Sequence, residues 1–330
     1  MLNKSTIAKL KSSKNLLAFS AGGDSTALLF LLLQHEIKFD IAIVDYGVRE
    51  QSKLELCYAH ELAKKHDFEC FSLTSPMIES NFEANARQIR YDFFDELIAL
   101  HHYENLLTAH HLGDRFEWML MQFCKGAGCP ELTGMKETES RENYALVRPL
   151  LHLDKSELLL YLQENEIRYF EDESNLHEKY KRNYFRKNHA KPLLEKHLSG
   201  IKKSFEYMDE DVRDLIEEMS MDTLHEFAYA KSSHGKRSDL LSIDKYFKSI
   251  GFLISSNEKN LLKKNDTVVI SRKFVVNQEH GFVFITPYME AKEMTKEFKE
   301  KMRRLKIEPK LRAYVYSNKE VEALLTSLLS

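Results

Sequence analysis

The first half of the chain alternates short apolar runs with longer stretches of helical periodicity. Runs with the length and residue content of buried strands lie at residues 15–19, 39–46, 68–73, 105–110 and 145–150. Stretches with helical spacing between or after them cover residues 24–33, 82–100 and 155–164. Because strands that alternate with helices form a mostly parallel sheet covered on both faces, the pattern predicts a doubly wound α/β fold.

Two of these helices have candidate capping residues in front of them. Asn81 or Ser80 precedes the helix at 82–100, and Asp154 precedes the helix at 155–164. Short polar side chains at such positions accept a hydrogen bond from a free backbone N–H of the first turn. We therefore expect both helices to begin where these residues stand.

The pattern changes after residue 200. Residues 201–229 are rich in Glu and Asp and lack strand signals, which predicts a connecting helix. Short apolar runs separated by charged or glycine turns follow at residues 267–270, 274–276 and 282–285. We therefore predict an α/β domain at 1–199, a helical linker at 200–235 and a small α+β C-terminal domain at 236–330.

Length and composition agree with two soluble domains. The chain has 330 residues, of which 43% are hydrophobic and 30% charged. No apolar run approaches the roughly 18 residues that a membrane span needs, and the N-terminus lacks a secretory signal pattern. We expect a cytoplasmic protein with no membrane partner.

The four cysteines contain no C-x-x-C pair. This argues against a zinc ribbon, an iron-sulfur ligand set or a dithiol redox site, so buried reduced thiols are expected. Cys124 and Cys129 flank a glycine-rich turn, which leaves a metal or redox role open for those two.

Charge is uneven along the chain although the net charge is only -3. Residues 231–330 carry 20 Lys and Arg against 12 Asp and Glu, whereas the preceding residues carry 28 against 39. A polyanion would be held partly by the basic rear third. A solvated helical surface explains the same charges, so the pattern alone leaves nucleic-acid binding open.

The most informative segment joins the first strand directly to a helix through the small residues Ser20, Ala21, Gly22, Gly23, Asp24 and Ser25. Small residues let backbone N–H groups approach a phosphate, and a helix N-terminus adds partial positive charge. Ser20 and Ser25 can donate hydroxyl hydrogen bonds. Asp24 can help to hold a Mg²⁺ ion that neutralises departing pyrophosphate. The segment therefore predicts an ATP-binding loop.

This loop resembles the S-G-G-x-D-S loop of the ATP pyrophosphatases, the PP-loop superfamily. It lacks the lysine of the kinase-type G-x-x-x-x-G-K-[ST] loop and the G-x-G-x-x-G dinucleotide pattern. Ala21 stands where the superfamily has glycine. Because alanine penalises positive φ, we expect the Ala21 peptide to adopt an ordinary backbone region.

Seven further segments, in order, are similar to those of one PP-loop family, the tRNA(Ile)-lysidine synthetases. They lie at residues 44–52, 81–91, 108–117, 125–135, 148–151, 171–175 and 182–186. This chain departs from the family pattern at Asp45, Tyr46, Gly113 and Glu131. Each match is weak alone, but their common order over about residues 15–190 is specific.

The resemblance implies a ligase that forms a carbon–nitrogen bond with ATP, Mg²⁺, free L-lysine and tRNA(Ile) with a CAU anticodon. ATP would adenylate C2 of the wobble cytidine with release of pyrophosphate, and lysine would displace AMP to give lysidine. No protein nucleophile is needed, so positioning and charge stabilisation should dominate catalysis, with Asp24, Asp114, Glu117 and Arg186 as the catalytic set. A homodimer is one expected assembly.

The acidic partners for lysine are expected at Asp114 and Glu117. They are three residues apart on the helix after the fourth strand, so their side chains face the same way. The resemblance implies that they bind the lysine amine. Alternatively, they only cap and solvate the start of that helix.

The nucleotide or tRNA contacts are expected at His110, His111, Arg87 and Arg182. The histidines end a strand at the sheet edge where open α/β folds bind ligands, although a structural role explains each equally well. Arg182 and Arg186 could contact the adenylate phosphate or the RNA backbone, or form an exposed basic helical face. Arg87 could contact RNA or pack against neighbouring acids.

Two other functions remain open. A PP-loop tRNA thiolase would use the same loop, but the paired C-x-x-C ligands expected there are missing. The departures at Ala21, Asp45 and Gly113 leave open a nucleotide-binding or RNA-binding protein that lacks turnover. A requirement for lysine separates the synthetase from both.

Overall fold

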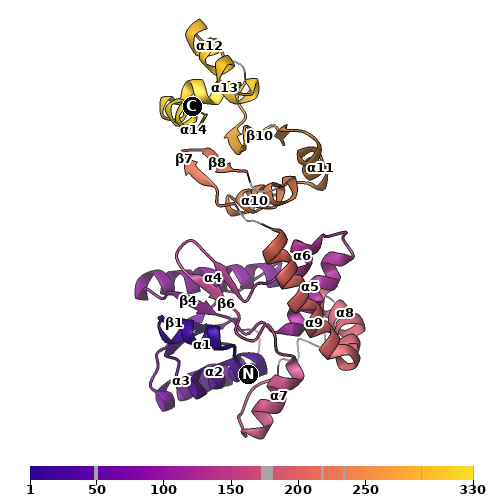
Figure 1. The fold of residues 1–330 in the computed structure, drawn as a ribbon. Coiled ribbons are helices and arrows are strands. Elements are labelled where there is room, and N and C mark those ends of the chain that lie inside the picture. The colour runs from indigo at the N-terminus through magenta and orange to yellow at the C-terminus, as the bar shows by residue number, and fades with distance from the viewer. Residues whose placement is uncertain (48–50, 172–180, 217–218, 233–234, 291, 330) are drawn as a thin grey trace. The chain divides into compact units, whose positions relative to one another are not determined.

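The computed structural model describes residues 1–47, 51–171, 181–216, 219–232, 235–290 and 292–329 (Figure 1). It divides into two compact units, Met1–Glu210 and Asp211–Ser330. Each unit has its own sheet and its own buried core. Among the described residues, no helix has both the length and the apolar character that crossing a membrane requires.

The first unit is built on a six-stranded sheet with the order β3-β2-β1-β4-β6-β5. Its strands are β1 (Asn15–Ala18), β2 (Phe39–Asp45), β3 (Cys70–Thr74), β4 (Asn105–Leu107), β5 (Thr138–Ser140) and β6 (Ala145–Val147). The five strands expected from the sequence are present and pair in parallel. The edge strand β5 is antiparallel and was not predicted, because its three residues are polar and its pairing partner β6 decides its conformation.

Helices cover both faces of this sheet, which confirms the doubly wound α/β fold. They are α1 (Lys4–Lys11), α2 (Gly23–Gln34), α3 (Gln51–His66), α4 (Phe82–His101), α5 (Leu112–Phe123), α6 (Cys129–Thr133), α7 (Lys155–Glu164), α8 (Lys181–Phe185), η2 (Arg186–Ala190) and α9 (Lys191–Leu215). Because neighbouring strand residues point to opposite faces, Leu17 and Leu107 belong to the core with α2 and α7. Leu16 and Leu106 belong to the core with α4.

The predicted caps had different outcomes. Asp154 caps α7 in a reciprocal box with Glu157, as expected. Asn81 stands at the N-cap position of α4, but it has left-handed φ and ψ and its side chain makes no capping hydrogen bond. Its amide therefore does not supply the cap that the sequence predicted.

The second unit is an α+β domain around a five-stranded antiparallel sheet, β7-β8-β11-β10-β9. Its elements are β7 (Asp222–Leu224), β8 (Phe227–Lys231), α10 (Lys236–Ser249), α11 (Ser256–Lys264), β9 (Thr267–Ile270), β10 (Phe274–Glu279), β11 (Phe282–Pro287), α12 (Lys296–Arg304), α13 (Pro309–Ser317) and α14 (Lys319–Leu329). Helices α10 and α11 pack on one face of the sheet, and α12 to α14 pack on the other.

The expected helix at residues 201–229 is wrong in its second half. Helix α9 ends at Leu215, and β7 and β8 follow within the segment that was expected to be only a linker. The buried residues Phe227 and Ala228 of β8 pack into the two faces of the second core. This pairing depends on β11, more than 50 residues later in the chain, so local composition gave no signal for it.

Candidate active site

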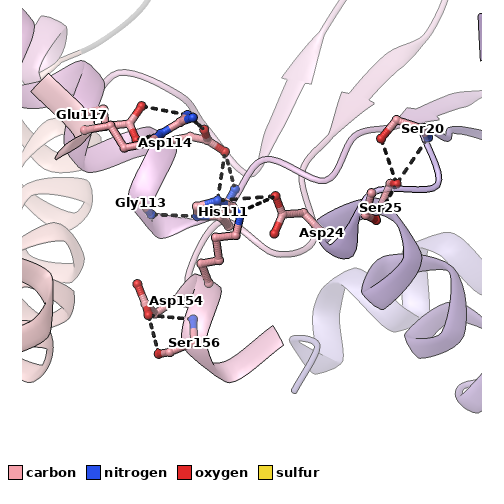
Figure 2. Close-up of polar contacts among 12 residues, drawn as sticks. Ser20, Asp24, Ser25, His111, Gly113, Asp114, Glu117, Asp154 and Ser156 are labelled. Atoms are coloured by element: carbon pink, nitrogen blue, oxygen red, sulfur yellow. Dashed lines mark hydrogen bonds and ion pairs between the residues drawn. The ribbon is translucent and has the colours of Figure 1, made fainter. Parts of the chain in front are cut away.

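The strand order of the first sheet reverses at β1 and β4, which lie side by side and run parallel. Open α/β sheets bind ligands beyond the carboxyl ends of the strands at such a point. Strand β1 leads into residues 19–25, and β4 leads into residues 108–111. The fold therefore brings the predicted phosphate loop and the two histidines to the same edge of the sheet. Figure 2 shows His111 beside Asp24 of the loop.

The phosphate loop is held by its own serines. The Oγ atoms of Ser20 and Ser25 are 3.1 Å apart, and the Ser25 hydroxyl also donates to the carbonyl oxygen of Gly22 at 3.1 Å (Figure 2). Gly23 starts α2, and a Cβ placed there would lie 3.3 Å from Leu159 of α7. Glycine at position 23 therefore lets α7 pack closely over the loop.

Ala21 corrects one prediction. Its φ is +56°, in the left-handed region, whereas an ordinary backbone region was expected. The Phe170 N–H donates to the Ala21 carbonyl oxygen at 2.9 Å, and the alanine side chain is fully buried. The tertiary contact with residue 170 therefore sets the loop conformation, and Ala21 adopts the backbone that glycine would adopt there.

We expect Ala21→Gly to leave the free energy of unfolding within about 1 kcal/mol of the wild type. Glycine relieves roughly 1–2 kcal/mol of left-handed strain but loses about 0.8 kcal/mol of methyl burial and about 0.5–1 kcal/mol through chain entropy. Ala21→Val should destabilise more strongly, because a β-branched residue is still less compatible with positive φ. Urea unfolding of the three proteins measures this, and equal stability of the valine and glycine variants would contradict it.

Asp24 lies at the start of α2 and faces the side chains of His111 and Lys155. Its Oδ2 is 3.8 Å from His111 Nε2 and 3.8 Å from Lys155 Nζ. Its Oδ1 is buried and has no hydrogen-bond partner among the described residues. A buried carboxylate oxygen without a partner is costly, so this atom fits a ligand such as Mg²⁺.

No group of three or more His, Cys, Asp or Glu side chains that could hold a metal occurs in the described part of the chain. Mg²⁺ usually takes one or two protein carboxylates and completes its shell with water and substrate phosphates. Asp24 fits that kind of site, in which most ligands come with ATP.

His111 caps helix α5 with its ring. The backbone N–H of Gly113 donates to His111 Nδ1 at 3.0 Å, and the Asp114 carboxylate accepts from the backbone N–H of His111 at 3.1 Å (Figure 2). Since Nδ1 accepts, Nε2 carries the proton of the neutral ring and faces Asp24. A Cβ at Gly113 would lie 2.7 Å from the ring, so glycine, where the family has Asp, leaves room for this cap.

Asp114 and Glu117 form an ion-pair network with two arginines. Arg182 donates to Asp114 Oδ1 at 2.6 Å and to Glu117 Oε2 at 3.0 Å. Arg186 donates to both oxygens of Glu117 and is 3.5 Å from Asp114 Oδ1. Glu117 is only 2% exposed, so it does not solvate the helix start, although Asp114 does cap it. The alternative of an exposed basic face for the arginines is wrong.

The network keeps its charges. Burial acts to raise the pKa of Asp114, but the positive charges of His111 and Arg182 outweigh it and hold that pKa well below its ordinary value. Burial acts to lower the pKa of Arg186, but its bond to Glu117 outweighs it and raises that pKa. Asp114 and Arg186 therefore keep their charges at neutral pH, and the network pairs two carboxyl groups with two guanidinium groups.

His110 lies three residues beyond the end of β4, because the expected strand at 105–110 ends at Leu107, and it stays neutral. Burial is the main cause that lowers its pKa to about 4, and the positive charges of Arg148, Arg182 and Arg87 add to it. Its Nδ1 lies 2.9 Å from the Thr108 hydroxyl oxygen. A neutral ring beside the phosphate loop can hydrogen-bond a base or a ribose without adding charge.

We expect His110 to make stability depend on pH between about 6.5 and 4. Because its folded pKa is lowered, the unfolded chain binds more protons in that window, and stability falls as pH falls through it. The loss should reach about 2–3 kcal/mol for a shift of this size. Thermal unfolding of the wild type and of His110→Gln at several pH values from 7 to 4 measures this loss. If the stability of both proteins changed with pH in the same way, the lowered pKa would not belong to His110.

Arg87 and Tyr46 are engaged outside the ion-pair network. The Arg87 guanidinium lies over the Tyr91 ring at 4.6 Å, not against an acid. The Tyr46 hydroxyl donates to the Ala86 carbonyl oxygen at 3.0 Å and ties the end of β2 to α4. The resemblance segments at 44–52 and 171–175 lie partly outside the described residues.

Two residues near the site were not predicted. Lys155 reaches Asp24 from the first turn of α7, and the capping residue Asp154 next to it was the available signal. Arg115 is buried, packs on Phe205 and pairs with Asp209, which ties α5 to α9. The pairing of Arg115 with Asp209 is visible only in the three-dimensional structure, since the two residues are 94 positions apart in the sequence.

None of the four cysteines forms a disulfide, but the expectation of buried thiols is wrong for three of them. Cys57, Cys124 and Cys129 are exposed, and Cys70 is half-buried. Burial raises the pKa of the Cys70 thiol to about 11, which keeps it protonated.

Comparison with known proteins agrees with this geometry. A family profile described as a PP-loop domain matches residues 2–193. The chain is 41% identical to a tRNA(Ile)-lysidine synthase of Campylobacter jejuni strain RM1221 over 95% of each chain. It is 42% identical to a tRNA(Ile)-lysidine synthase of Wolinella succinogenes over 93% of this chain and 94% of the relative.

Among solved structures, the U34-tRNA thiolase NcsA from Methanococcus maripaludis, described with its [4Fe-4S] cluster, is 16% identical with a TM-score of 0.53. The match covers 65% of this chain and 79% of that one. At this identity it supports the fold alone. The profile match over more than half of the chain, together with relatives matched over nearly their full length, shows that this chain belongs to the tRNA(Ile)-lysidine synthase family of PP-loop proteins.

Proposed function

We propose that the protein converts the wobble cytidine of tRNA(Ile) with a CAU anticodon to lysidine. The O2 atom of the base attacks the α-phosphorus of ATP, and the bond from that phosphorus to the bridging oxygen breaks with its electron pair to release pyrophosphate. An amine of free L-lysine then attacks C2. The bond between C2 and oxygen breaks, AMP leaves with that oxygen, and the amine releases its proton to solvent.

The observation that carries this proposal is the meeting of a phosphate loop with a buried pair of carboxylates at one sheet edge. Ser20, Ser25 and the N-terminus of α2 supply donors for the triphosphate. His111 links the two parts, because its Nε2 is 3.8 Å from Asp24 and 3.6 Å from Asp114. An activated base at the loop would therefore lie close to an amine held at the carboxylates.

Asp114 and Glu117 suit a cationic substrate. Each is largely buried and paired with an arginine, and a lysine ammonium would replace a guanidinium group as their partner. Arg182 is 40% exposed on its side chain, so it can leave the network at lower cost than the buried carboxylates. We propose that the arginines keep the carboxylates neutralised until lysine binds, and that a released Arg182 or Arg186 contacts the phosphate of the adenylate or the RNA.

Mg²⁺ belongs to this proposal through Asp24. When bound, the ion would neutralise charge on the pyrophosphate, and Asp24 Oδ1 is the buried oxygen that would hold it. The protein's own residues position the reactants: the loop orients the triphosphate, and His111 and the neutral ring of His110 border the base. A homodimer stays a prediction.

The last hundred residues of the second domain carry a basic surplus that suits a polyanion, whereas the whole unit Asp211–Ser330 carries 21 Lys and Arg against 18 Asp and Glu. Residues 231–330 carry 20 Lys and Arg against 12 Asp and Glu. Helix α12 has Lys301, Arg303 and Arg304 in its last turn, where cations also favour the helix dipole. We propose that this domain contributes to holding the tRNA, together with Arg87 on α4.

The test is incubation of the purified protein with tRNA(Ile), ATP, Mg²⁺ and L-lysine, followed by mass analysis of the tRNA nucleosides. We expect a nucleoside heavier by the lysine that replaces the cytidine O2, with one AMP and one pyrophosphate released for each. Omitting lysine should prevent this product. A sulfur-containing nucleoside would favour a thiolase instead, and no change of the tRNA would support a binding protein without turnover.

A further inference from the structure

The phosphate loop of this protein carries no cationic side chain of its own. Residues 20–25 are small, hydroxylic or acidic, whereas loops of the kinase type carry a lysine that reaches the phosphates. Pyrophosphate is a strongly charged leaving group, so charge stabilisation at its oxygens lowers the barrier to its departure. A cation from another element would supply what the loop lacks.

Among the described residues, His111 and Lys155 lie 3.8 Å from Asp24 and the charge of Arg186 also acts on it, but His111 and Arg186 are committed elsewhere. The His111 ring caps α5 through its Nδ1. The Arg186 guanidinium donates to both oxygens of Glu117. Lys155 Nζ is 3.8 Å from Asp24 Oδ2, beyond hydrogen-bond distance, and its side chain is 52% exposed. Lys155 is thus the cation that can move to a ligand without breaking a close contact to Asp24.

The backbone that carries Lys155 is firmly placed over the loop. Helix α7 begins with the capping box of Asp154 and Glu157, and Lys155 is its first residue. Leu159, one turn later, would touch a Cβ at Gly23 at 3.3 Å. Lys202 of α9 also donates to Glu157 Oε2 at 2.6 Å, although the capping box by itself holds this turn. A fixed backbone with a flexible, exposed side chain suits a lysine whose ammonium group must stay in contact with a phosphate group that moves during the reaction.

We propose that Lys155 binds the β- and γ-phosphates of ATP and stabilises the pyrophosphate as it leaves. This assignment rests on the lysidine-forming reaction proposed above and adds a residue from α7 to the phosphate loop. Without ATP, the ammonium lies beside Asp24. With ATP bound, it contacts the phosphate oxygens, and Asp24 is released to the metal ion.

The experiment compares Lys155→Met, which keeps the length of the side chain, with Lys155→Arg, which keeps its charge. Calorimetric titration with Mg²⁺ and ATP, and separately with AMP, measures binding to each full-length protein. Loss of one charge-assisted contact predicts about tenfold to a hundredfold weaker ATP binding for Lys155→Met. AMP binding should stay within about twofold, because AMP lacks the β- and γ-phosphates. Lys155→Arg should recover most of the ATP affinity.

Lys202→Met is the matched control, because it removes a lysine that contacts the same helix but not the loop. It should bind ATP as the wild type does. An equal loss of AMP and ATP affinity in Lys155→Met, or the same ATP defect in Lys202→Met, would show that the helix position matters and would overturn the assignment. Unchanged ATP affinity in Lys155→Met would overturn it as well.

The outcome is separate from that of the proposed function. If the wild type forms lysidine while Lys155→Met keeps normal ATP affinity, only the role of Lys155 fails. If the wild type forms no lysidine, the proposed reaction fails, whereas the selective loss of ATP over AMP binding still tests the phosphate contact.

Discussion

Asp24→Ala should abolish adenylation, and Asp24→Asn should slow it by about 100-fold to 1000-fold. The carboxylate has one buried oxygen with no partner among the described residues, and a neutral amide would bind Mg²⁺ far more weakly. Loss of metal-assisted charge stabilisation at the pyrophosphate amounts to several kcal/mol, which corresponds to this range. Pyrophosphate release in the presence of tRNA and saturating ATP measures the effect.

Asp67→Asn provides a control for this prediction. Asp67 has a φ of +57°, a conformation that asparagine tolerates as well as aspartate does, and it lies away from the loop at the end of α3. This variant should release pyrophosphate at the wild-type rate. Near-normal turnover of Asp24→Ala, with the control also normal, would refute the proposed role of Asp24.

Glu117→Gln should raise the KM for lysine by about 30-fold to 100-fold and leave the KM for ATP nearly unchanged. The substitution keeps the shape of a buried side chain but removes one of the two charges available to the lysine ammonium. It also leaves Arg186 without its closest anionic partner, so the free energy of unfolding should fall by about 1–3 kcal/mol. Steady-state kinetics with varied lysine, together with urea unfolding, measure both effects.

A double variant separates the two consequences. Glu117→Gln combined with Arg186→Gln removes both charges of the pair and should recover much of the lost stability, because no uncompensated charge stays buried. Lysine binding, measured by calorimetry, should not recover. If lysine affinity returned with stability, Glu117 would act only as a structural partner of Arg186, and the substrate role would be wrong.

Local patterns were enough for the five parallel strands of the first domain, for helices α2, α4 and α7, and for the chemistry of the loop. The run at 15–19 becomes β1, the helix at 155–164 begins and ends as predicted, and the small residues at 20–25 join strand to helix. Hydrophobic periodicity and capping act over a few residues, so neighbouring side chains suffice to specify them. The ordered motifs likewise indicate the family from the sequence alone.

Contacts between residues that are distant along the chain determine the features that local patterns do not specify. Ala21 takes a left-handed backbone because residue 170 pairs with it, and β8 forms because β11 lies beside it. The pairing of Arg182 with Asp114 joins positions 68 residues apart, and Lys155 reaches Asp24 only because α7 packs over the loop. The sequence thus determines which reactive side chains the protein has, whereas the tertiary structure determines which of them lie in contact. The physical reason is that burial and charge pairing depend on residues that are distant along the chain.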